Sequence, residues 1–153
     1  MIKIGILSDT HCTFDDPLKR FFAEVDELWH AGDIGSYECA REIAAFKPLL
    51  AVHGNCDDHL VRLEYKKFNS FDCEGIRVLI THIGYDPQAK LNLTQINPTI
   101  FVCGHTHILK VHNYNGILCI NPGAAGIGRQ IVRTAIRLTI DGEKIDNLEV
   151  LEI

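Results

Sequence analysis

The sequence predicts an α/β fold in which two β-sheets pack face to face and helices cover their outer sides. In the first 55 residues, short apolar runs alternate with helical patterns, which is typical of parallel strands joined by helices. The second half is richer in β-prone runs, and two of the gaps between them hold Asn-Gly and Asp-Gly pairs, which favour hairpin turns. At 153 residues, the chain 1–153 is expected to form one domain whose core needs neither disulfides nor oligomerisation.

Two predicted helices separate three predicted strands in the first half. The first helix is opened by Asp16-Pro17 and runs to Ala23. The second is capped by Ser36 and runs to about Phe46. The strands are expected at residues 2–8, 28–30 and 49–53.

A polar residue lies just past each of these three strands. Asp9, Asp33 and Asn55 occupy these positions. Since binding sites of parallel sheets assemble at the carboxyl ends of the strands, the three side chains are expected to converge there.

The second half is predicted to contain seven further strands and one helix. The helix is expected from about Pro87 to Ile96. Asn115-Gly116 and Asp141-Gly142 are predicted hairpin turns. The strands are expected at residues 64–70, 76–82, 100–103, 108–113, 117–120, 131–140 and 145–151.

Composition narrows the class of protein. The net charge of -5 and the lack of a basic cluster beyond Lys66-Lys67 argue against stable nucleic-acid binding. No run approaches the roughly 20 apolar residues of a membrane span, and the N-terminus does not resemble a signal peptide. The six cysteines are evenly spread without a CxxC pair, which favours free thiols and a cytoplasmic location.

Five short motifs carry oxygen and imidazole donors, each at the end of an apolar run. Residues i and i+2 of an extended segment point to the same side, so Asp9 with His11, and His105 with His107, are each expected to face one centre. Glycine before Asp33, Asn55 and His105 allows a sharp turn there. The seven donors exceed one tetrahedral site and suit a pair of divalent cations: Asp9, His11, Asp33, Asn55, His82, His105 and His107.

The motifs D-x-H, G-D, G-N-x-D, a later histidine and G-H-x-H, in this order, resemble those of the calcineurin-like metallophosphoesterases. The resemblance is strongest to their small, single-domain bacterial and archaeal phosphodiesterase branch. It implies a four-layer αββα sandwich of two mixed sheets. It also implies one metal held by Asp9, His11 and His107, a second held by Asn55, His82 and His105, and Asp33 as the bridge.

Three positions depart from patterns found in the wider family. Cys56 follows the Gly-Asn pair, where many relatives have a histidine that is thought to assist the leaving group. The small branch often has cysteine there, so the proton donor stays unassigned. Ile83 precedes Gly84 where many members have glycine directly after the histidine, and Ala124 replaces a serine.

The resemblance implies an enzyme that hydrolyses a small phosphate ester, more specifically a phosphodiester, through a hydroxide bridging two divalent metals. Manganese is the expected metal, with Fe, Ni, Zn or Mg as alternatives, and a homo-oligomer is possible. The rival hypothesis is a non-catalytic protein-binding scaffold with the same fold, as in the phosphoesterase-like subunit of retromer. A protein with only a structural zinc site is disfavoured, because such sites are usually rich in cysteine.

Plainer interpretations remain for several residues. The seven donors could be caps and turn residues at strand ends, although an ordered set of seven makes this improbable. Asp57 either orients a neighbouring ligand or caps its own turn. Cys12 and Cys56 are expected to be structural. Four other histidines are expected to be surface or core residues: His30, His53, His59 and His112.

Overall fold

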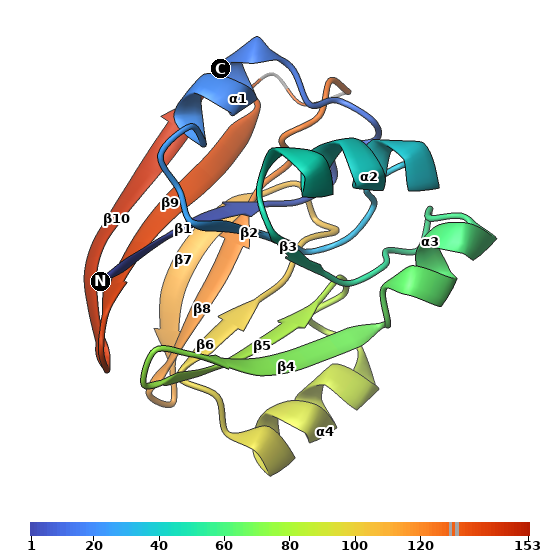
Figure 1. The fold of residues 1–153 in the computed structure, drawn as a ribbon. Helices are drawn as coiled ribbons and strands as arrows, with labels where there is room; N and C mark the ends of the chain where they lie inside the picture. The colour runs from blue at the N-terminus through green and yellow to red at the C-terminus, as the bar shows by residue number, and fades with distance from the viewer. Residues whose placement is uncertain (129, 131) are drawn as a thin grey trace.

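In the computed structural model, which describes residues 1–128, 130 and 132–153, two mixed five-stranded sheets lie face to face (Figure 1). The first contains, in spatial order, β10 (Lys144–Glu152), β9 (Thr134–Asp141), β1 (Ile2–Leu7), β2 (Glu27–His30) and β3 (Leu49–Ala51). The second contains β4 (Phe68–Cys73), β5 (Ile76–Thr81), β6 (Ile100–Val102), β8 (Ile117–Pro122) and β7 (Leu109–Tyr114).

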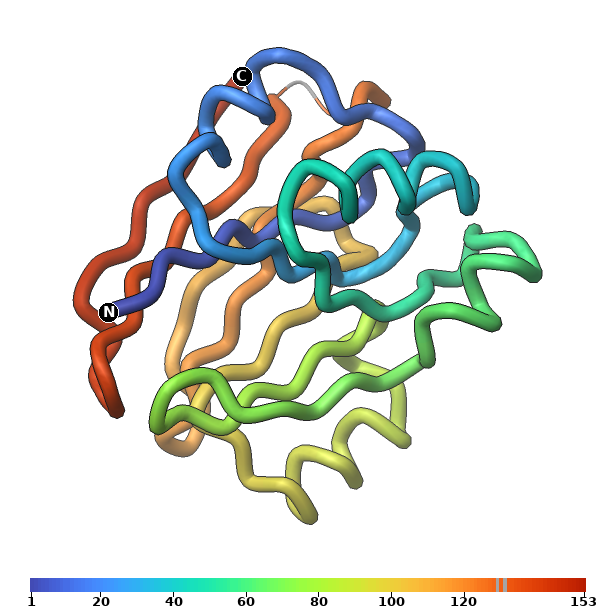
Figure 2. Tube along the Cα trace, in the orientation of Figure 1, coloured from blue at the N-terminus to red at the C-terminus, as the bar shows by residue number. Residues whose placement is uncertain are grey.

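The N-terminal strand β1 lies in the middle of the first sheet, between β2 and the late strand β9 (Figure 2). It pairs parallel with β2 and antiparallel with β9. In the second sheet, β5, β6 and β8 run parallel to one another. The parallel strands of both sheets thus have carboxyl ends from which loops can converge.

Helices cover the outer faces of both sheets. The inner faces share one core in which Ile4 and Ile6 of the first sheet meet Val78 and Ile80 of the second. Outside the first sheet lie α1 (Asp16–Phe21) and α2 (Tyr37–Phe46), and α4 (Pro87–Ile96) packs on the second. The predicted four-layer αββα arrangement is confirmed. None of the helices in the described residues is long and apolar enough to cross a membrane.

Most predicted elements are found with ends that differ by one to three residues. Ser36 caps α2 by accepting a hydrogen bond from the backbone N–H of Cys39 at 3.3 Å. Both predicted hairpin turns join antiparallel strands, β7 to β8 and β9 to β10. Residue 131, where the strand 131–140 was expected to begin, lies outside the described residues, and the observed β9 begins at Thr134.

One helix contradicts the prediction of a strand at residues 64–70. The structure forms α3 at His59–Glu64 and begins β4 only at Phe68. Asp58 caps α3 by accepting a hydrogen bond from the N–H of Val61 at 3.0 Å. Asp58, three residues before an apolar residue, was a signal in the sequence for the start of a helix. The β-prone residues that follow it led to the prediction of a strand instead.

The prediction that all six cysteines are free is wrong for two of them. The structure joins Cys12, next to His11, to Cys39 in the first turn of α2 by a disulfide. The tertiary fold places two segments 27 residues apart side by side, which even spacing along the sequence could not indicate. The remaining cysteines are free: Cys56, Cys73, Cys103 and Cys119.

We expect the Cys12→Ser/Cys39→Ser double variant to lose about 3 kcal/mol of unfolding free energy relative to the oxidised protein, because the cross-link restricts the unfolded chain. Urea denaturation with and without a dithiol reductant measures this. The reductant should shift the wild-type midpoint to that of the double variant and leave the variant unchanged. If the urea midpoint of the wild type were the same with and without the reductant, the disulfide would be contradicted.

Candidate metal centre

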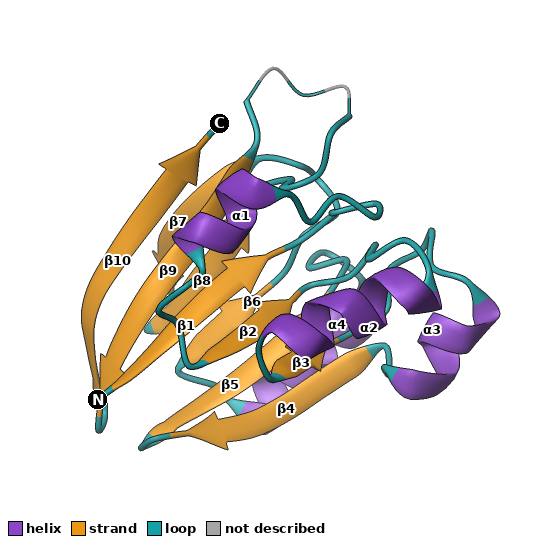
Figure 3. Ribbon diagram, turned by 45° about the horizontal axis from the view of Figure 1, so that its top comes forward, coloured by secondary structure: helices purple, strands orange, loops and turns teal. Residues whose placement is uncertain are grey.

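Loops follow the carboxyl ends of the parallel strands (Figure 3). All seven predicted donors belong to these loops. Asp9 and His11 follow β1, Asp33 follows β2, and Asn55 follows β3. In the second sheet His82 directly follows β5, and the loop after β6 carries His105 and His107. The contacts described below join residues from both sheets, so the site lies at the common edge of the sandwich.

The backbone at these positions is not extended, contrary to the prediction from side-chain alternation. Five of the nine non-glycine residues with positive φ in the described chain belong to the set: Asp9 (53°), His11 (44°), Asp33 (56°), His105 (72°) and His107 (64°). Left-handed geometry is unfavourable for such residues and tends to concentrate at functional sites. Asp9, His11 and His107 come together through these left-handed turns and not through a strand pleat.

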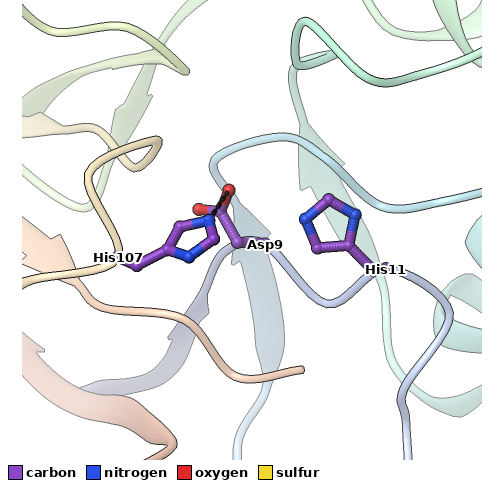
Figure 4. Close-up of side chains that lie close together, drawn as sticks. All are labelled: Asp9, His11 and His107. Carbon is purple, nitrogen blue, oxygen red and sulfur yellow. Dashed lines mark hydrogen bonds and ion pairs between the residues drawn. The ribbon is translucent and has the colours of Figure 1, made fainter. Parts of the chain in front are cut away.

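One cluster of donor atoms contains Asp9, His11 and His107, whose ligand atoms all lie within 4.8 Å of one another. His107 Nε2 lies 3.1 Å from Asp9 Oδ1. Figure 4 shows the imidazoles of His11 and His107 on either side of the Asp9 carboxylate. One carboxylate oxygen and two ring nitrogens can therefore hold a cation here.

A second cluster shares Asp9 with the first and adds Asp33 and His82. All three residues are buried. His82 Nδ1 donates to the carbonyl oxygen of Ala31 at 2.7 Å, which orients the ring so that Nε2 faces the carboxylates. His82 Nε2 lies 3.2 Å from Asp33 Oδ2 and 3.8 Å from Asp9 Oδ1.

His82 Nε2 is a buried polar atom without a hydrogen-bond partner among the residues that the structure describes. Its 3.2 Å approach to Asp33 lacks hydrogen-bonding geometry. Buried polar atoms are normally satisfied, so this one marks a position for an electrophilic group. The donor set therefore fits a divalent cation.

The charges of Asp33 and His82 are coupled. Burial raises the pKa of Asp33, but His82 and the Cys56 N–H, which donates to Asp33 Oδ1 at 2.8 Å, outweigh it and hold the pKa below its usual range. Burial lowers the pKa of His82, but Asp33 and Asp9 reverse this and raise it. Without a cation, the carboxylates thus favour a proton on His82, and a metal ion would compete with that proton.

Asn55 and His105 form a pair beside these clusters. His105 Nδ1 lies 3.1 Å from Asn55 Oδ1, and the His105 ring centroid lies 5.2 Å from that of His82. The backbone N–H of His105 donates to Asp9 Oδ2 at 3.1 Å. Asn55 and His105 therefore border the second cluster from the solvent side.

Two glycines permit this close assembly, as the sequence predicted. Gly32 has a φ of 102°, and a Cβ there would come within 2.7 Å of His82 Nδ1. A Cβ on Gly104 would meet the Ser8 hydroxyl and approach Asp9 Oδ2 to 2.8 Å. Any side chain at these positions would displace a donor.

Asp57 supports the donor loops through hydrogen bonds to their backbone. Its Oδ2 accepts hydrogen bonds from the N–H groups of Asp33 at 3.0 Å and Gly54 at 2.7 Å, and its Oδ1 accepts from Gly35 at 3.0 Å. It thus ties the loop after β2 to the loop after β3. The sequence left two roles open for Asp57, and the structure shows both. Asp57 fixes its own turn, and it also orients Asp33.

Sequence reasoning missed Ser8 as a further positioning residue. Its hydroxyl donates to Asp9 Oδ2 at 2.6 Å and fixes that carboxylate. A serine at the end of an apolar strand, directly before an expected ligand, was the available signal. Cys56 is exposed, yet partial desolvation of its thiol and the charge of the nearby Asp33 raise the pKa of the thiol, so it stays protonated at neutral pH.

His30 is a core histidine, as predicted. Its Nε2 lies 2.9 Å from the Thr10 hydroxyl, and its Nδ1 accepts from the N–H of Gly32 at 3.0 Å. His53 lies 2.8 Å from the Tyr65 carbonyl through Nδ1, while His59 and His112 are exposed. None of these contacts makes the four histidines part of the donor set.

We expect His30 to make the protein less stable in mild acid. Burial, aided by His82, lowers the pKa of His30 from 6.5 to about 3. The unfolded chain takes up a proton below pH 6.5 and the native chain does not, so this contribution to stability is complete above pH 6.5 and falls towards pH 3. Between pH 7.5 and 5.5 the loss should be about 1.4 kcal/mol.

Urea denaturation at both pH values, compared between wild type and His30→Gln, isolates this loss, since glutamine does not titrate. Most of the pH-dependent loss should disappear in the variant. An equal loss in both proteins would show that His30 is protonated in the native state.

The chain is similar to known proteins both in sequence and in fold. The sequence model of the calcineurin-like phosphoesterase superfamily domain matches residues 2–143. A probable metallophosphoesterase of Methanothermobacter thermautotrophicus is 28% identical over 153 residues, covering 94% of this chain and 88% of the relative. A phosphodiesterase of Methanocaldococcus jannaschii is 27% identical over 138 residues, covering 80% of this chain and 83% of the relative.

A solved structure shares the fold at lower identity. Vacuolar protein sorting 29 from Cryptosporidium parvum superimposes with a TM-score of 0.80 at 16% identity, covering 99% of this chain and 97% of that one. This likeness concerns the fold alone.

Proposed function

The chain belongs to the calcineurin-like phosphoesterase superfamily, and from this premise we propose that it hydrolyses a small phosphodiester with the help of two divalent metal ions. The observation that carries the proposal is the buried, unpartnered Nε2 of His82 facing two carboxylates. In a cluster of caps and turns this atom would have a hydrogen-bond partner, whereas here it faces carboxylates that favour a proton or a metal ion on it.

We assign each donor to one of two cations. Asp9, His11 and His107 would hold the first, and their mutual distances within 4.8 Å support this group. Asn55, His82 and His105 would hold the second, supported by the contact between Asn55 and His105. Asp33 would bridge both, because its Oδ2 lies 3.9 Å from His11 Nε2 and 3.2 Å from His82 Nε2.

Two divalent cations would supply Lewis acidity and would make a water molecule sufficiently acidic to attack phosphorus near neutral pH. Asp9 and Asp33 are buried carboxylates that would repel an anionic phosphate, so substrate binding requires that their charge be neutralised. Ser8, Ala31 and Asp57 fix the orientations of Asp9, His82 and Asp33 respectively. In the reaction, water gives its oxygen and one hydrogen to the phosphate, the ester P–O bond breaks, and the leaving oxygen takes up the second proton of water.

Manganese is our proposed metal, because a set of carboxylate, amide and imidazole donors without thiolate suits it. The same donors accept Fe, Ni or Zn, and Mg is a further alternative. We propose a cytoplasmic location because four of the six cysteines are free, although the Cys12–Cys39 disulfide is of a kind that is uncommon there. The competing function is a protein-binding scaffold. The fold shared with vacuolar protein sorting 29 is the reason to consider it.

The test is metal reconstitution. Protein stripped with a chelator and dialysed against Mn²⁺ should contain about two ions per chain and hydrolyse bis(4-nitrophenyl) phosphate, and chelator should abolish this activity. Elemental analysis and release of 4-nitrophenolate provide the two readouts. A folded, manganese-treated protein that hydrolyses none of the phosphomonoesters, phosphodiesters and cyclic nucleotides in a screen would favour the scaffold.

A further inference from the structure

A pocket of about 870 Å³ opens on the outer face of the second sheet, between α4 and the edge strand β7. The helix α4 packs on Leu79 and Phe101 through Ala89 and Leu93. Residues of β8 on the same outer face form the floor of the pocket. The volume is in the range of small-molecule sites. None of the seven donors lines it.

The pocket and the candidate metal centre share one loop. Gly104 and Thr106, which flank His105, both line the pocket. From the pocket floor, Asn121 Nδ2 donates to the Gly104 carbonyl at 3.1 Å and to the Thr106 hydroxyl at 3.0 Å. The segment that carries His105 is thus also a wall of the pocket.

Tyr85 lies between the pocket and the candidate metal centre. Its ring lines the pocket, lies 6.0 Å from the His105 ring between centroids, and is 63% exposed. A molecule whose phosphate lies at the metal centre can therefore extend past Tyr85 and His105 into the pocket.

The lining is mostly apolar and carries no negative charge. Phe101, Ile117 and Cys119 provide buried apolar surface. Among the described lining residues the only formally charged side chains are two lysines, Lys90 and Lys110. An apolar group attached to an anionic phosphate suits this composition, and a cationic group does not.

We propose that this pocket, termed here the ester pocket, binds a bulky, mainly apolar ester group of the substrate while the phosphate lies at the seven-donor site. The inference rests on the proposed phosphodiesterase function and narrows its substrate class. It identifies Tyr85, Phe101 and the β8 floor as the surface that selects the ester group.

Two substrates with the same leaving group test the proposal: methyl 4-nitrophenyl phosphate and naphthalen-2-ylmethyl 4-nitrophenyl phosphate. In both, water adds its oxygen to phosphorus, the bond to 4-nitrophenolate breaks, and the proton passes to solvent. Burial of the naphthyl group should raise kcat/KM of the manganese-loaded wild type by about tenfold or more over the methyl ester.

Neighbouring substitutions on α4 provide a matched pair. Thr94 lines the ester pocket and Gln95 does not, although both are exposed. Thr94→Trp should occupy part of the pocket and reduce the preference for the naphthyl ester to less than about twofold, while methyl ester hydrolysis stays unchanged. Gln95→Trp should keep the wild-type preference.

A binding measurement on the same proteins adds a readout that does not depend on turnover. Calorimetric titration with naphthalen-2-ylmethyl methylphosphonate should give a dissociation constant about tenfold higher for Thr94→Trp than for Gln95→Trp. Equal constants, or equal ester preference in both variants, would overturn the ester pocket while active hydrolysis of the methyl ester leaves the proposed function standing. Absence of hydrolysis of both esters would remove the proposed function and this inference with it.

Discussion

His82→Ala is expected to lower kcat/KM for bis(4-nitrophenyl) phosphate by roughly a thousandfold or more, because a lost metal ligand removes several kcal/mol of transition-state stabilisation. The structure gives a specific reason. His82 Nε2 is one of two buried side-chain polar atoms without a hydrogen-bond partner in the described chain, and it faces the carboxylates of Asp9 and Asp33. Asn55→Ala should have the same effect, since Asn55 belongs to the same proposed set.

Both variants should fold, which circular dichroism and a cooperative thermal transition would show. Elemental analysis should find about one manganese ion per chain in place of two. The matched control is His59→Ala, which removes an exposed histidine at the start of α3 and should retain activity and metal content. Near-native rates in His82→Ala and Asn55→Ala would remove the case for a second metal.

Asp57→Asn is expected to lower the unfolding free energy by about 3 kcal/mol and the manganese affinity by roughly 10- to 100-fold. Asp57 is buried and accepts three backbone hydrogen bonds, from Asp33, Gly54 and Gly35. An amide has no negative charge and presents an NH₂ group to at least one of these N–H donors, so Asp33 loses its support.

Asp58→Asn is the control for this effect, because asparagine is as good an N-cap as aspartate and Asp58 caps α3. Urea denaturation and calorimetric titration with Mn²⁺ measure the two quantities. If both variants unfold at the same urea concentration and bind manganese equally, Asp57 has no positioning role.

The strand–helix order of the first half was predictable because its signals are local. An apolar run of a few residues, an N-cap such as Ser36 and a Pro at a helix start each act within one turn or one strand. The same locality explains the failure at α3. Its six residues are capped by Asp58, yet they adjoin a β-prone stretch, and a short helix offers little periodicity against such a neighbour.

The disulfide illustrates a feature that no local signal contains. Cys12 and Cys39 meet where the loop after β1, which contains three residues with left-handed backbone, lies beside the first turn of α2. Only the packing of α2 on the first sheet determines that distance. The ester pocket is similar, since it exists where α4 leaves the β8 side of its sheet uncovered.

The sequence by itself determined which residues are available for chemistry: donors of carboxylate, amide and imidazole type, each placed where an apolar strand ends. That information is local, since a strand and the polar residue after it are adjacent in the chain. The tertiary structure alone decided that donors from two sheets meet, that Asp9 is common to both clusters, and that His82 Nε2 has no partner among the described residues. These facts depend on sheet order and on left-handed backbone at the donors, which arise from long-range packing and are therefore not encoded in any short segment.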